Sequence, residues 1–342
     1  MLDGSDIFRC LDIETGEEHW RLQYPAAANF DYGNAPRATP ILAGDRLFTL
    51  GATGQIHAVE LSSGKILWKI SMTAMFGAPV PQWGFSPSPL LIDAVYDDTA
   101  LTSGKLVVPP GAPNAGLAAL DAMTGKVLWA SSPGRKTAYA SPQLVTFSGV
   151  RQILAYDEKS LGGWNPETGE RLWELVPRHS GDFNVPTPIP LDENRLYVVT
   201  ENNKGRIYRF DETGRIDPTP VFIQEELGHD SNTPVAGGNR IYAADWALLC
   251  LDAGNLEILW MLEDEAVGDY ATTILGDQRL LVSAYGGTVL LVDITTKPGR
   301  IVSRWQLFDE DEVVLSHPVV VGHRFLIRSA SKILCLRLVS DE

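Results

Sequence analysis

The chain has 342 residues, of which 44% are hydrophobic and 21% are charged, with 31 Gly and 22 Pro. This composition is globular and rich in turns, and it excludes a disordered chain. Lys and Arg together number 28 against 43 Asp and Glu, and the net charge of −15 repels phosphate backbones and anionic lipid headgroups, so we expect no nucleic-acid partner.

The sequence predicts no transmembrane segment, because no apolar run reaches the roughly 18 to 20 residues that span a bilayer. The first residues, MLDGSDIFRC, lack the basic and apolar regions of a signal peptide. Cys10, Cys250 and Cys335 each lie in an apolar, strand-like run. This placement favours buried free thiols over a disulfide framework.

A ten-residue motif recurs along the chain and ends in Trp. Its copies are LDIETGEEHW, VELSSGKILW, LDAMTGKVLW, WNPETGERLW and LDAGNLEILW. The closing residues, with one further Trp at the same spacing, are Trp20, Trp68, Trp129, Trp173, Trp260 and Trp305. Their separations are 48, 61, 44, 87 and 45 residues, and the longest contains a copy without Trp, RIYRFDETGRI, which ends at Ile216. A period of about 45 residues is typical of propeller blades, in which each repeat is one four-stranded sheet.

One repeat, residues 39–70, shows how four short strands follow from the local pattern. It reads TPILAG, RLFTLGATG, QIHAVELSSG and KILWKI, with Gly or Asp in the turns between apolar runs. The acidic residue before Thr-Gly or Ser-Gly can accept backbone N–H groups across the turn, and the Gly can take a positive φ. The Trp four residues later falls on the outer strand, where we predict that it fills the gap between one twisted blade and the next.

A Pro opens the first strand of most repeats, where no ladder donor is lost. It stands at Pro40, Pro89, Pro142, Pro188, Pro234 and Pro318, and ATTILG takes its place near Thr272. The innermost strands therefore number seven.

The outer hairpins also number seven, beginning with Ile7 to Trp20, but the C-terminal segment HPVVVGHRFLIRSASKILCLRL adds only three strands. We therefore expect an all-β propeller of seven to eight four-stranded blades, in one domain over residues 1–342. Eight blades, the first lacking its inner strands, are slightly favoured, because an outer hairpin alone would have an unpaired edge.

These motifs resemble those of the PQQ-like β-propeller repeat family, the quinoprotein-dehydrogenase-like superfamily, whose repeat is similar to LDAxTGxxxW. The resemblance covers nearly the whole chain, and WD40 repeats fit less well because no Trp-Asp dipeptide ends the units. It implies one of two uses. Some members are dehydrogenases that hold pyrroloquinoline quinone (PQQ) with calcium, and others are cofactor-free scaffolds similar to the outer-membrane assembly factor BamB. Fold alone does not choose between them.

The connections that enter the innermost strands of a propeller border one mouth of its channel, where binding sites are normally built. In this chain they are rich in aromatics, amides and histidines. The alternative is that these polar groups only cap strand ends and satisfy backbone groups. We predict ligand contacts at Tyr32, Arg37, Trp83, Arg135, Tyr139, Asn184, His229, Asp230, Asn232, Tyr270 and His317, with Lys136, Asp182 and Phe183 in the same loops.

A quinone dehydrogenase needs a carboxylate base, oxygen ligands for Ca²⁺ and a flat ring on which the quinone can stack. Asp230 with Asn232, or Asp182 with Asn184, offers oxygens, and Trp83 offers a platform. The sequence has neither the adjacent cysteines of many of the family's enzymes nor a Cys-x-x-Cys-His haem site.

We therefore expect a non-catalytic binding or assembly scaffold with no catalytic residues, no metal and no cofactor. Its protein or peptide partners would meet the channel mouth or an exposed blade edge. By resemblance, it would lie in the periplasm or at the cell surface. The alternative is a PQQ- and calcium-dependent alcohol or sugar dehydrogenase, and a third hypothesis is a sensor propeller from a larger kinase-related chain.

Overall fold

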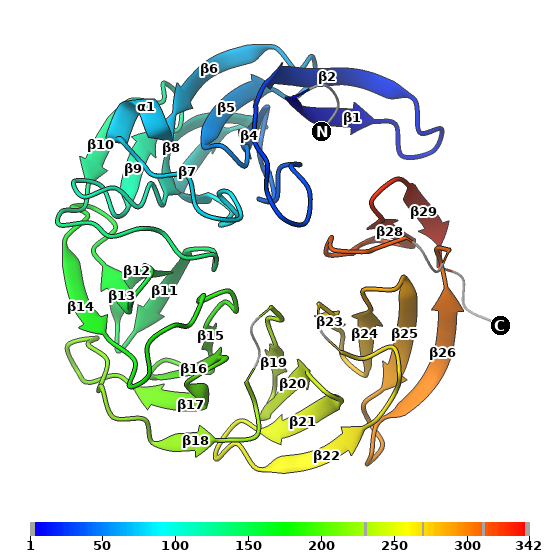
Figure 1. The fold of residues 1–342 in the computed structure, drawn as a ribbon. Coiled ribbons are helices and arrows are strands. Elements are labelled where there is room, and N and C mark those ends of the chain that lie inside the picture. Colours follow the sequence, from blue (N-terminus) through cyan, green and yellow to red (C-terminus); the bar gives the residue numbers. More distant parts are fainter. Residues whose placement is uncertain (1–3, 229–230, 269, 310–311, 339–342) are drawn as a thin grey trace. The chain divides into compact units, whose positions relative to one another are not determined.

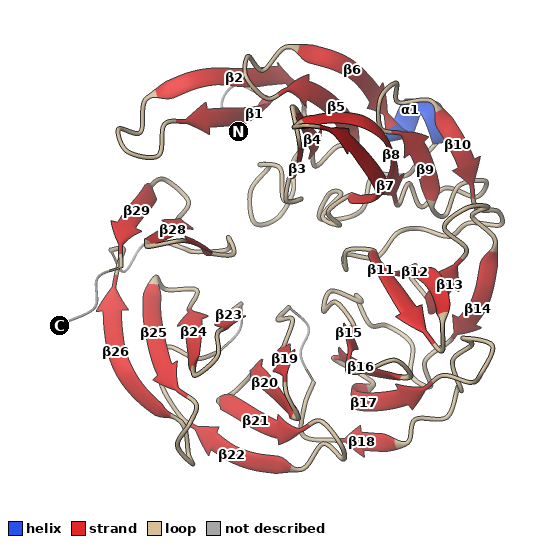
Figure 2. Ribbon diagram, turned by 180° about the vertical axis from the view of Figure 1, so that it is seen from behind, coloured by secondary structure: helices blue, strands red, loops and turns tan. Residues whose placement is uncertain are grey.

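The computed structural model describes residues 4–228, 231–268, 270–309 and 312–338. The chain divides into two compact units. The first comprises Met1–Thr187 with Phe210–Pro218, and the second comprises Pro188–Arg209 with Thr219–Glu342. Each unit consists of small antiparallel sheets whose strands follow one another in chain order (Figures 1 and 2). The prediction of a single domain is not tested by this division.

The first unit contains one two-stranded sheet, three four-stranded sheets and the short helix α1 (Met72–Phe76). The two-stranded sheet is β1 (Ser5–Leu11) and β2 (Glu18–Pro25). The four-stranded sheets are β3 (Ile41–Ala43), β4 (Arg46–Leu50), β5 (Gln55–Glu60) and β6 (Ile66–Ser71); β7 (Leu90–Asp97), β8 (Ala100–Val108), β9 (Ala118–Asp121) and β10 (Val127–Ala130); and β11 (Gln143–Phe147), β12 (Val150–Tyr156), β13 (Leu161–Trp164) and β14 (Arg171–Leu175).

The second unit contains three four-stranded sheets and one three-stranded sheet. The four-stranded sheets are β15 (Ile189–Pro190), β16 (Arg195–Thr200), β17 (Lys204–Arg209) and β18 (Phe222–Gln224); β19 (Val235–Gly237), β20 (Arg240–Ala244), β21 (Leu248–Asp252) and β22 (Ile258–Leu262); and β23 (Thr272–Leu275), β24 (Arg279–Ser283), β25 (Thr288–Asp293) and β26 (Arg300–Gln306). The three-stranded sheet is β27 (Val319–Val321), β28 (Arg324–Arg328) and β29 (Ile333–Arg337).

The predicted fold class is confirmed: the chain is an all-β propeller of four-stranded antiparallel blades. Among the described residues, seven strands open a sheet as the innermost strand, and seven hairpins close one as its outer pair. The preference for eight blades over seven is not supported. Apolar side chains fill the spaces between successive sheets, as where Phe48, Ile56, Leu106 and Leu120 form one buried cluster.

The recurring turn has the geometry that the motif predicted. Asp121 Oδ1 accepts the backbone N–H groups of Met123 and Thr124 at 3.0 and 2.7 Å, and also the Thr124 hydroxyl at 2.8 Å. Gly125 has a φ of 71°, in the left-handed region that favours glycine. Asp12 caps its turn in the same way. The polar half of the motif therefore builds the turn.

The motif Trp residues join successive sheets in the first unit by covering the next turn's glycine. Trp68 Nε1 donates to Ala122 O at 3.0 Å, and a Cβ on Gly125 would lie only 2.8 Å from the Trp68 ring. Trp129 bonds to Pro166 O at 3.1 Å and its ring covers Gly169. The first copy, Trp20 on Gly64, is built alike. Glycine is required at this position by both the positive φ and the close approach of the ring.

The remaining motif Trp residues differ in their contacts. Trp173 donates to Gln152 Oε1 at 2.6 Å and packs edge-on against Phe210. Trp260, like Trp173, is buried, and its ring lies against Gly299. Trp305 does not follow the expectation of docking, because its side chain is 40% exposed. The turn after β29 that it would cover by pattern falls in residues 339–342, outside the described residues.

The repeat without Trp has a different contact with its neighbour. From β18, Gln224 donates through Nε2 to Leu256 O at 3.0 Å, although it lies opposite Gly205 and so outside the register that the motif Trp has in other sheets. Leu256 holds the glycine position of the next motif copy with a φ of 64°, and it is 1% exposed. A buried Leu therefore fills space that a Trp ring occupies above glycine in other blades.

The two cysteines in β1 and β21 lie opposite motif tryptophans, as Cys10 does to Trp20 and Cys250 to Trp260. Small residues at these positions leave room for the ring. All three cysteines are free, as predicted, but Cys335 in β29 is exposed. The expectation that Cys335 is buried is wrong because no outer strand covers β29 among the described residues. No helix in the described part of the chain is long and apolar enough to cross a membrane.

Candidate binding site on the loops of the first unit

Three loops of the first unit bring an aromatic cluster together. Trp83 comes from the segment between α1 and β7, Tyr139 from the segment before β11, and Phe183 from the segment after β14. The Trp83 ring centroid lies 5.1 Å from that of Tyr139 and 4.7 Å from that of Phe183, the latter edge-on. Trp83 and Tyr139, which the sequence places in loops at one mouth of the channel, are therefore close together, while ligand binding by these residues stays a prediction.

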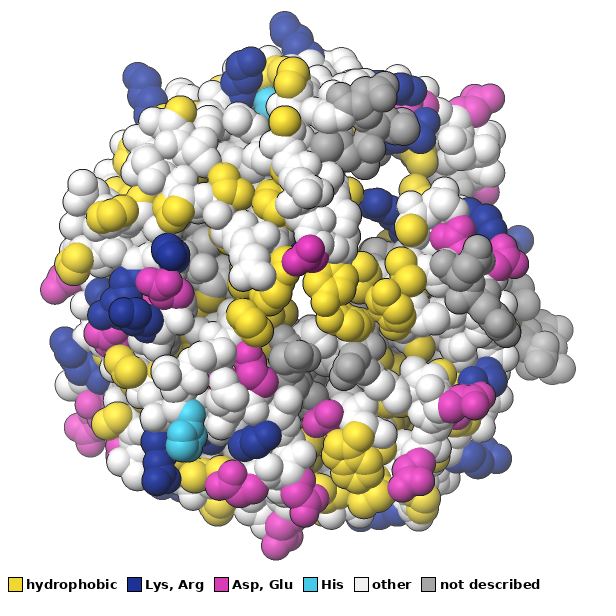
Figure 3. Space-filling view, viewed as in Figure 1, with side chains coloured by type: hydrophobic (Ala, Val, Ile, Leu, Met, Phe, Trp, Pro, Cys, Tyr) yellow, Lys and Arg dark blue, Asp and Glu magenta, His cyan; other side chains and the backbone are white. Residues whose placement is uncertain are grey.

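The cluster is only partly covered by protein. Phe183 is 46% exposed, and burial raises the pKa of the Tyr139 hydroxyl while a hydrogen bond with the Trp83 backbone opposes that rise. Figure 3 shows that hydrophobic side chains reach the surface of the molecule in several groups, with acidic and basic side chains between them. Exposed aromatic side chains of this kind are enriched at protein interfaces.

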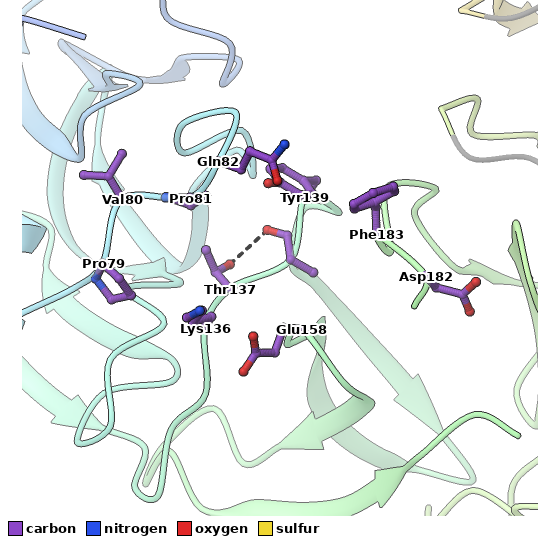
Figure 4. A pocket seen from close by; sticks show the side chains of 11 residues that line it. Pro79, Val80, Pro81, Gln82, Lys136, Thr137, Tyr139, Glu158, Asp182 and Phe183 are labelled. Atoms are coloured by element: carbon purple, nitrogen blue, oxygen red, sulfur yellow. Dashed lines mark hydrogen bonds between the residues drawn. The ribbon is translucent and has the colours of Figure 1, made fainter. Parts of the chain in front are cut away.

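A cavity of about 290 Å³ adjoins the cluster (Figure 4). One wall is the segment Pro79–Gln82, and the Tyr139 and Phe183 rings border the cavity from two other loops. Its remaining lining residues are Lys136, Thr137, Ala138, Glu158 and Asp182. Sequence reasoning missed Glu158, because it considered only connections that enter innermost strands, whereas Glu158 lies in the turn between β12 and β13.

The segment before β11 and the turn between β12 and β13 carry two adjacent pairs of opposite charges, of which only one forms an ion pair. The segments are joined by a bridge between Thr137 and Asp157, and by a 2.8 Å bond from Glu158 N to Lys136 O. Arg135 forms ion pairs with Asp157 at 3.3 Å and with Glu174. Lys136 and Glu158, one residue further along each segment, are both exposed, line the cavity, and have no ion pair with a described residue.

Other predicted contacts in the first unit stabilise loops. Arg37 donates to three carbonyls of its own loop, those of Asp31, Gly33 and Ala35, and burial lowers the pKa of its guanidinium. The buried Asn184 donates through Nδ2 to Asp157 O at 3.2 Å. Tyr32 is 61% exposed. These bonds match the alternative in which polar loop residues satisfy backbone groups.

The predicted contacts in the second unit lie outside this cluster. Asn232 is buried and donates to Ala244 O at 2.9 Å. Tyr270 lies 5.5 Å from Tyr285 between ring centroids, and His317 is exposed. His229 and Asp230 fall outside the described residues.

Binding of PQQ with calcium stays a prediction of the alternative hypothesis, and the part of the chain that the structure describes shows no cluster of acidic ligands for it. Such a site needs several oxygen ligands converging on the ion. Among the described residues, no group of three or more His, Cys, Asp or Glu side chains could hold a metal ion. Asn184 and Asn232 direct their amide nitrogens at backbone carbonyls, and Trp83 already packs against two rings.

A separate polar group lies between the first two sheets of the first unit. Tyr24 stacks on His57 with ring centroids 4.3 Å apart, and the buried Asp6 lies across the strand pair from Tyr24. Burial lowers the pKa of His57 to about 4, with a further contribution from the charge of Lys69, and burial raises the pKa of Asp6. Beside them, a Cβ on Gly51 would collide with both Asp6 and Tyr24. None of these residues lines the cavity.

Comparison with known proteins places this arrangement in a family. A family model described as outer membrane protein assembly factor BamB matches residues 3–182 and 113–336. The chain belongs to this PQQ-like β-propeller family. A search of curated proteins found no match to the chain.

Solved structures share the fold of this family member at low sequence identity. BamB from Moraxella catarrhalis is 16% identical with a TM-score of 0.63, over 94% of this chain and 88% of that one. A europium-containing methanol dehydrogenase is 14% identical with a TM-score of 0.58, over 94% and 78%. A computationally designed protein, Ika8, is 13% identical with a TM-score of 0.61, over 92% and 87%. These likenesses establish the fold and leave the activity open.

Proposed function

We propose that this propeller is a non-catalytic binding scaffold whose first-unit loops engage a protein or peptide partner. The observation that carries the proposal is the aromatic cluster of Trp83, Tyr139 and Phe183, which three separate loops place together beside a cavity. Large aromatic side chains that are rigidly held and partly exposed are the usual anchors of protein interfaces. A partner that covers Phe183 would bury an apolar surface that now contacts water.

The size of the cavity favours a partner's side chains over a cofactor. Its volume of about 290 Å³ lies just below the roughly 300 to 1,000 Å³ of pockets that enclose drug-sized ligands. A side chain of a partner segment fits within such a volume. The family's BamB description supports a protein partner, and we extend the proposal to a periplasmic or cell-surface location. Cell fractionation with a periplasmic marker tests that location.

Site-specific photo-crosslinking tests the scaffold proposal directly. A photoreactive phenylalanine analogue at position 183, expressed in cells, should give discrete protein adducts after irradiation. The matched control places the same analogue at Lys126, an exposed position in a motif turn that should give none. Equal adduct patterns at both positions, or none at 183, would contradict the loop surface as the binding site.

The scaffold is proposed to act without PQQ. Titration of the purified protein with PQQ and CaCl₂, followed by Trp fluorescence, should show no saturable binding. An artificial electron acceptor with a panel of alcohols and sugars should then show no turnover. Calcium-dependent binding with turnover would replace the scaffold by a quinoprotein dehydrogenase.

A further inference from the structure

We infer that the cavity beside the aromatic cluster binds a single apolar side chain from an extended partner segment. Lys136 would contact an acidic residue on one side of that apolar residue, and Glu158 a basic residue on the other. The inference rests on the proposed function and names its partner by chemistry. The occupant is a peptide segment with one apolar residue between an acidic and a basic residue.

The apolar preference follows from two walls of the cavity, whose other lining residues include Gln82, Thr137 and Asp182. Pro79, Val80 and Pro81 form one wall, and the rings of Tyr139 and Phe183 lie across from it (Figure 4). Proline side chains in the wall restrict the backbone there, so the cavity is largely formed before a ligand arrives. A preformed cavity lowers the entropic cost of binding.

The charge specificity follows from the contrast with the neighbouring ion pairs. Arg135 pairs with Asp157 and Glu174, while Lys136 and Glu158 line the cavity with no ion pair to any described residue. The backbone bond between their segments holds the two residues next to each other on the same rim. A segment with an acidic residue near Lys136 and a basic residue near Glu158 complements both charges. Such complementarity contributes more to specificity than to affinity.

An extended segment suits this spacing of groups. Alternate side chains of an extended chain point to the same side, so an apolar residue can enter the cavity while the residues two positions before and after it meet the charged rim. The pocket would therefore recognise a short sequence pattern in the partner. For a segment that binds in one chain direction, the two charges then specify the order of its acidic and basic residues.

A charge-exchange experiment tests this recognition. A displayed library of random nine-residue peptides is selected against the wild-type chain and against the double variant Lys136→Glu with Glu158→Lys. The wild type should enrich an apolar residue between an acidic and a basic residue, and the double variant should enrich the reverse order. Both substituted positions are exposed, so the fold should be kept, and thermal unfolding checks it.

Synthetic peptides from each selection then give the magnitudes by fluorescence anisotropy. Each single variant, Lys136→Glu or Glu158→Lys, should bind the peptide selected on the wild type about fivefold more weakly. The double variant should bind the peptide selected on it more tightly than the wild-type peptide by a similar factor. Val80→Trp, which fills the cavity, should abolish binding of both peptides.

Two results would overturn the inference in distinguishable ways. If peptides bind the wild type and the double variant equally well but bind Phe183→Ala more weakly, recognition of charge by Lys136 and Glu158 is wrong and the proposed scaffold stands. If no peptide is enriched and PQQ with calcium binds with turnover, the scaffold proposal fails along with the inference.

Discussion

Two regions of this propeller solve the same packing problem with different residues. In the first unit, Trp68 lies over Gly125 and Trp129 over Gly169, so a large ring on one blade meets a residue without a side chain on the next. In the second unit, the outer strand β18 has no Trp, and the next turn carries Leu256 where the motif has Gly. The bulky side chain at this contact therefore comes from the turn of the following blade and not from the outer strand of the preceding one.

The comparison shows that the Trp of one motif copy and the glycine position of the next copy form a single contact between neighbouring blades. Loss of the ring from one repeat is accompanied by a larger residue in the following repeat, because close packing tolerates neither a void nor an overlap. Leu256 accepts a positive φ, which is unfavourable for a residue with a Cβ, in return for burial. The two halves of the motif therefore belong to one interface and depend on each other.

Removal of a docking ring should have the largest effect. We expect Trp129→Ala to lower the free energy of unfolding by about 3 to 4 kcal/mol, because it leaves a void over Gly169 and removes the bond to Pro166 O. Urea unfolding measures the change. The matched control is Trp305→Ala, whose exposed ring should cost less than about 1 kcal/mol. Equal losses would contradict the docking role.

A side chain added beneath a ring should have the next largest effect. Gly125→Ala places a Cβ 2.8 Å from the Trp68 ring and at a positive φ, and we expect a loss of about 2 to 3 kcal/mol. Gly16→Ala is the control, since Gly16 has a similar φ of 73° with no atom within 4 Å of its Cβ. Thermal unfolding measures both losses of stability, and the amount by which the Gly125→Ala loss exceeds the Gly16→Ala loss is the effect of the ring. No excess would mean that the ring does not require glycine.

The stability of the fold should depend on pH through His57, which stacks on Tyr24. The folded pKa of about 4 lies below the unfolded value of 6.5, so the unfolded chain binds more protons between these values, and stability falls as pH falls through this window. We expect a loss of about 2 kcal/mol between pH 7 and pH 5 from this residue.

The raised pKa of Asp6 acts in the opposite direction, because the folded state then holds its proton to higher pH than the unfolded chain. His57→Phe keeps the stack on Tyr24 and removes the titrating group, so the difference between the two unfolding curves isolates His57. If both proteins lose stability equally on acidification, the assigned role of His57 is wrong.

The smallest expected effect is an energetic coupling at the contact without Trp. Gln224→Trp alone should destabilise the chain by forcing a ring against Leu256, and Leu256→Gly alone should leave a void. Together they should show a coupling of about 1 kcal/mol or more in a double-mutant cycle measured by urea unfolding, because the ring of the first variant can occupy space that the second vacates. Additive losses would show that the two positions do not substitute for each other.

Much of the fold was predictable because the motif is local. The Asp121 turn is made by atoms within five residues of each other, so its sequence specifies it directly, and the period of the Trp residues indicates the blades. The candidate site was predictable only in part. Loop position was enough to group Trp83 with Tyr139 and Phe183, but Glu158 came from a turn that the pattern did not mark.

The sequence by itself determined the repeat, the four-stranded blade and the outer position of each Trp, because these depend on periodicity and turn chemistry within a few residues. Tertiary structure decided which glycine each ring covers, how Leu256 replaces a ring, and why Arg135 is paired while Lys136 is open to the cavity. The physical reason is that those outcomes depend on atoms far apart in the chain, whose distances only the packing of one blade on another sets.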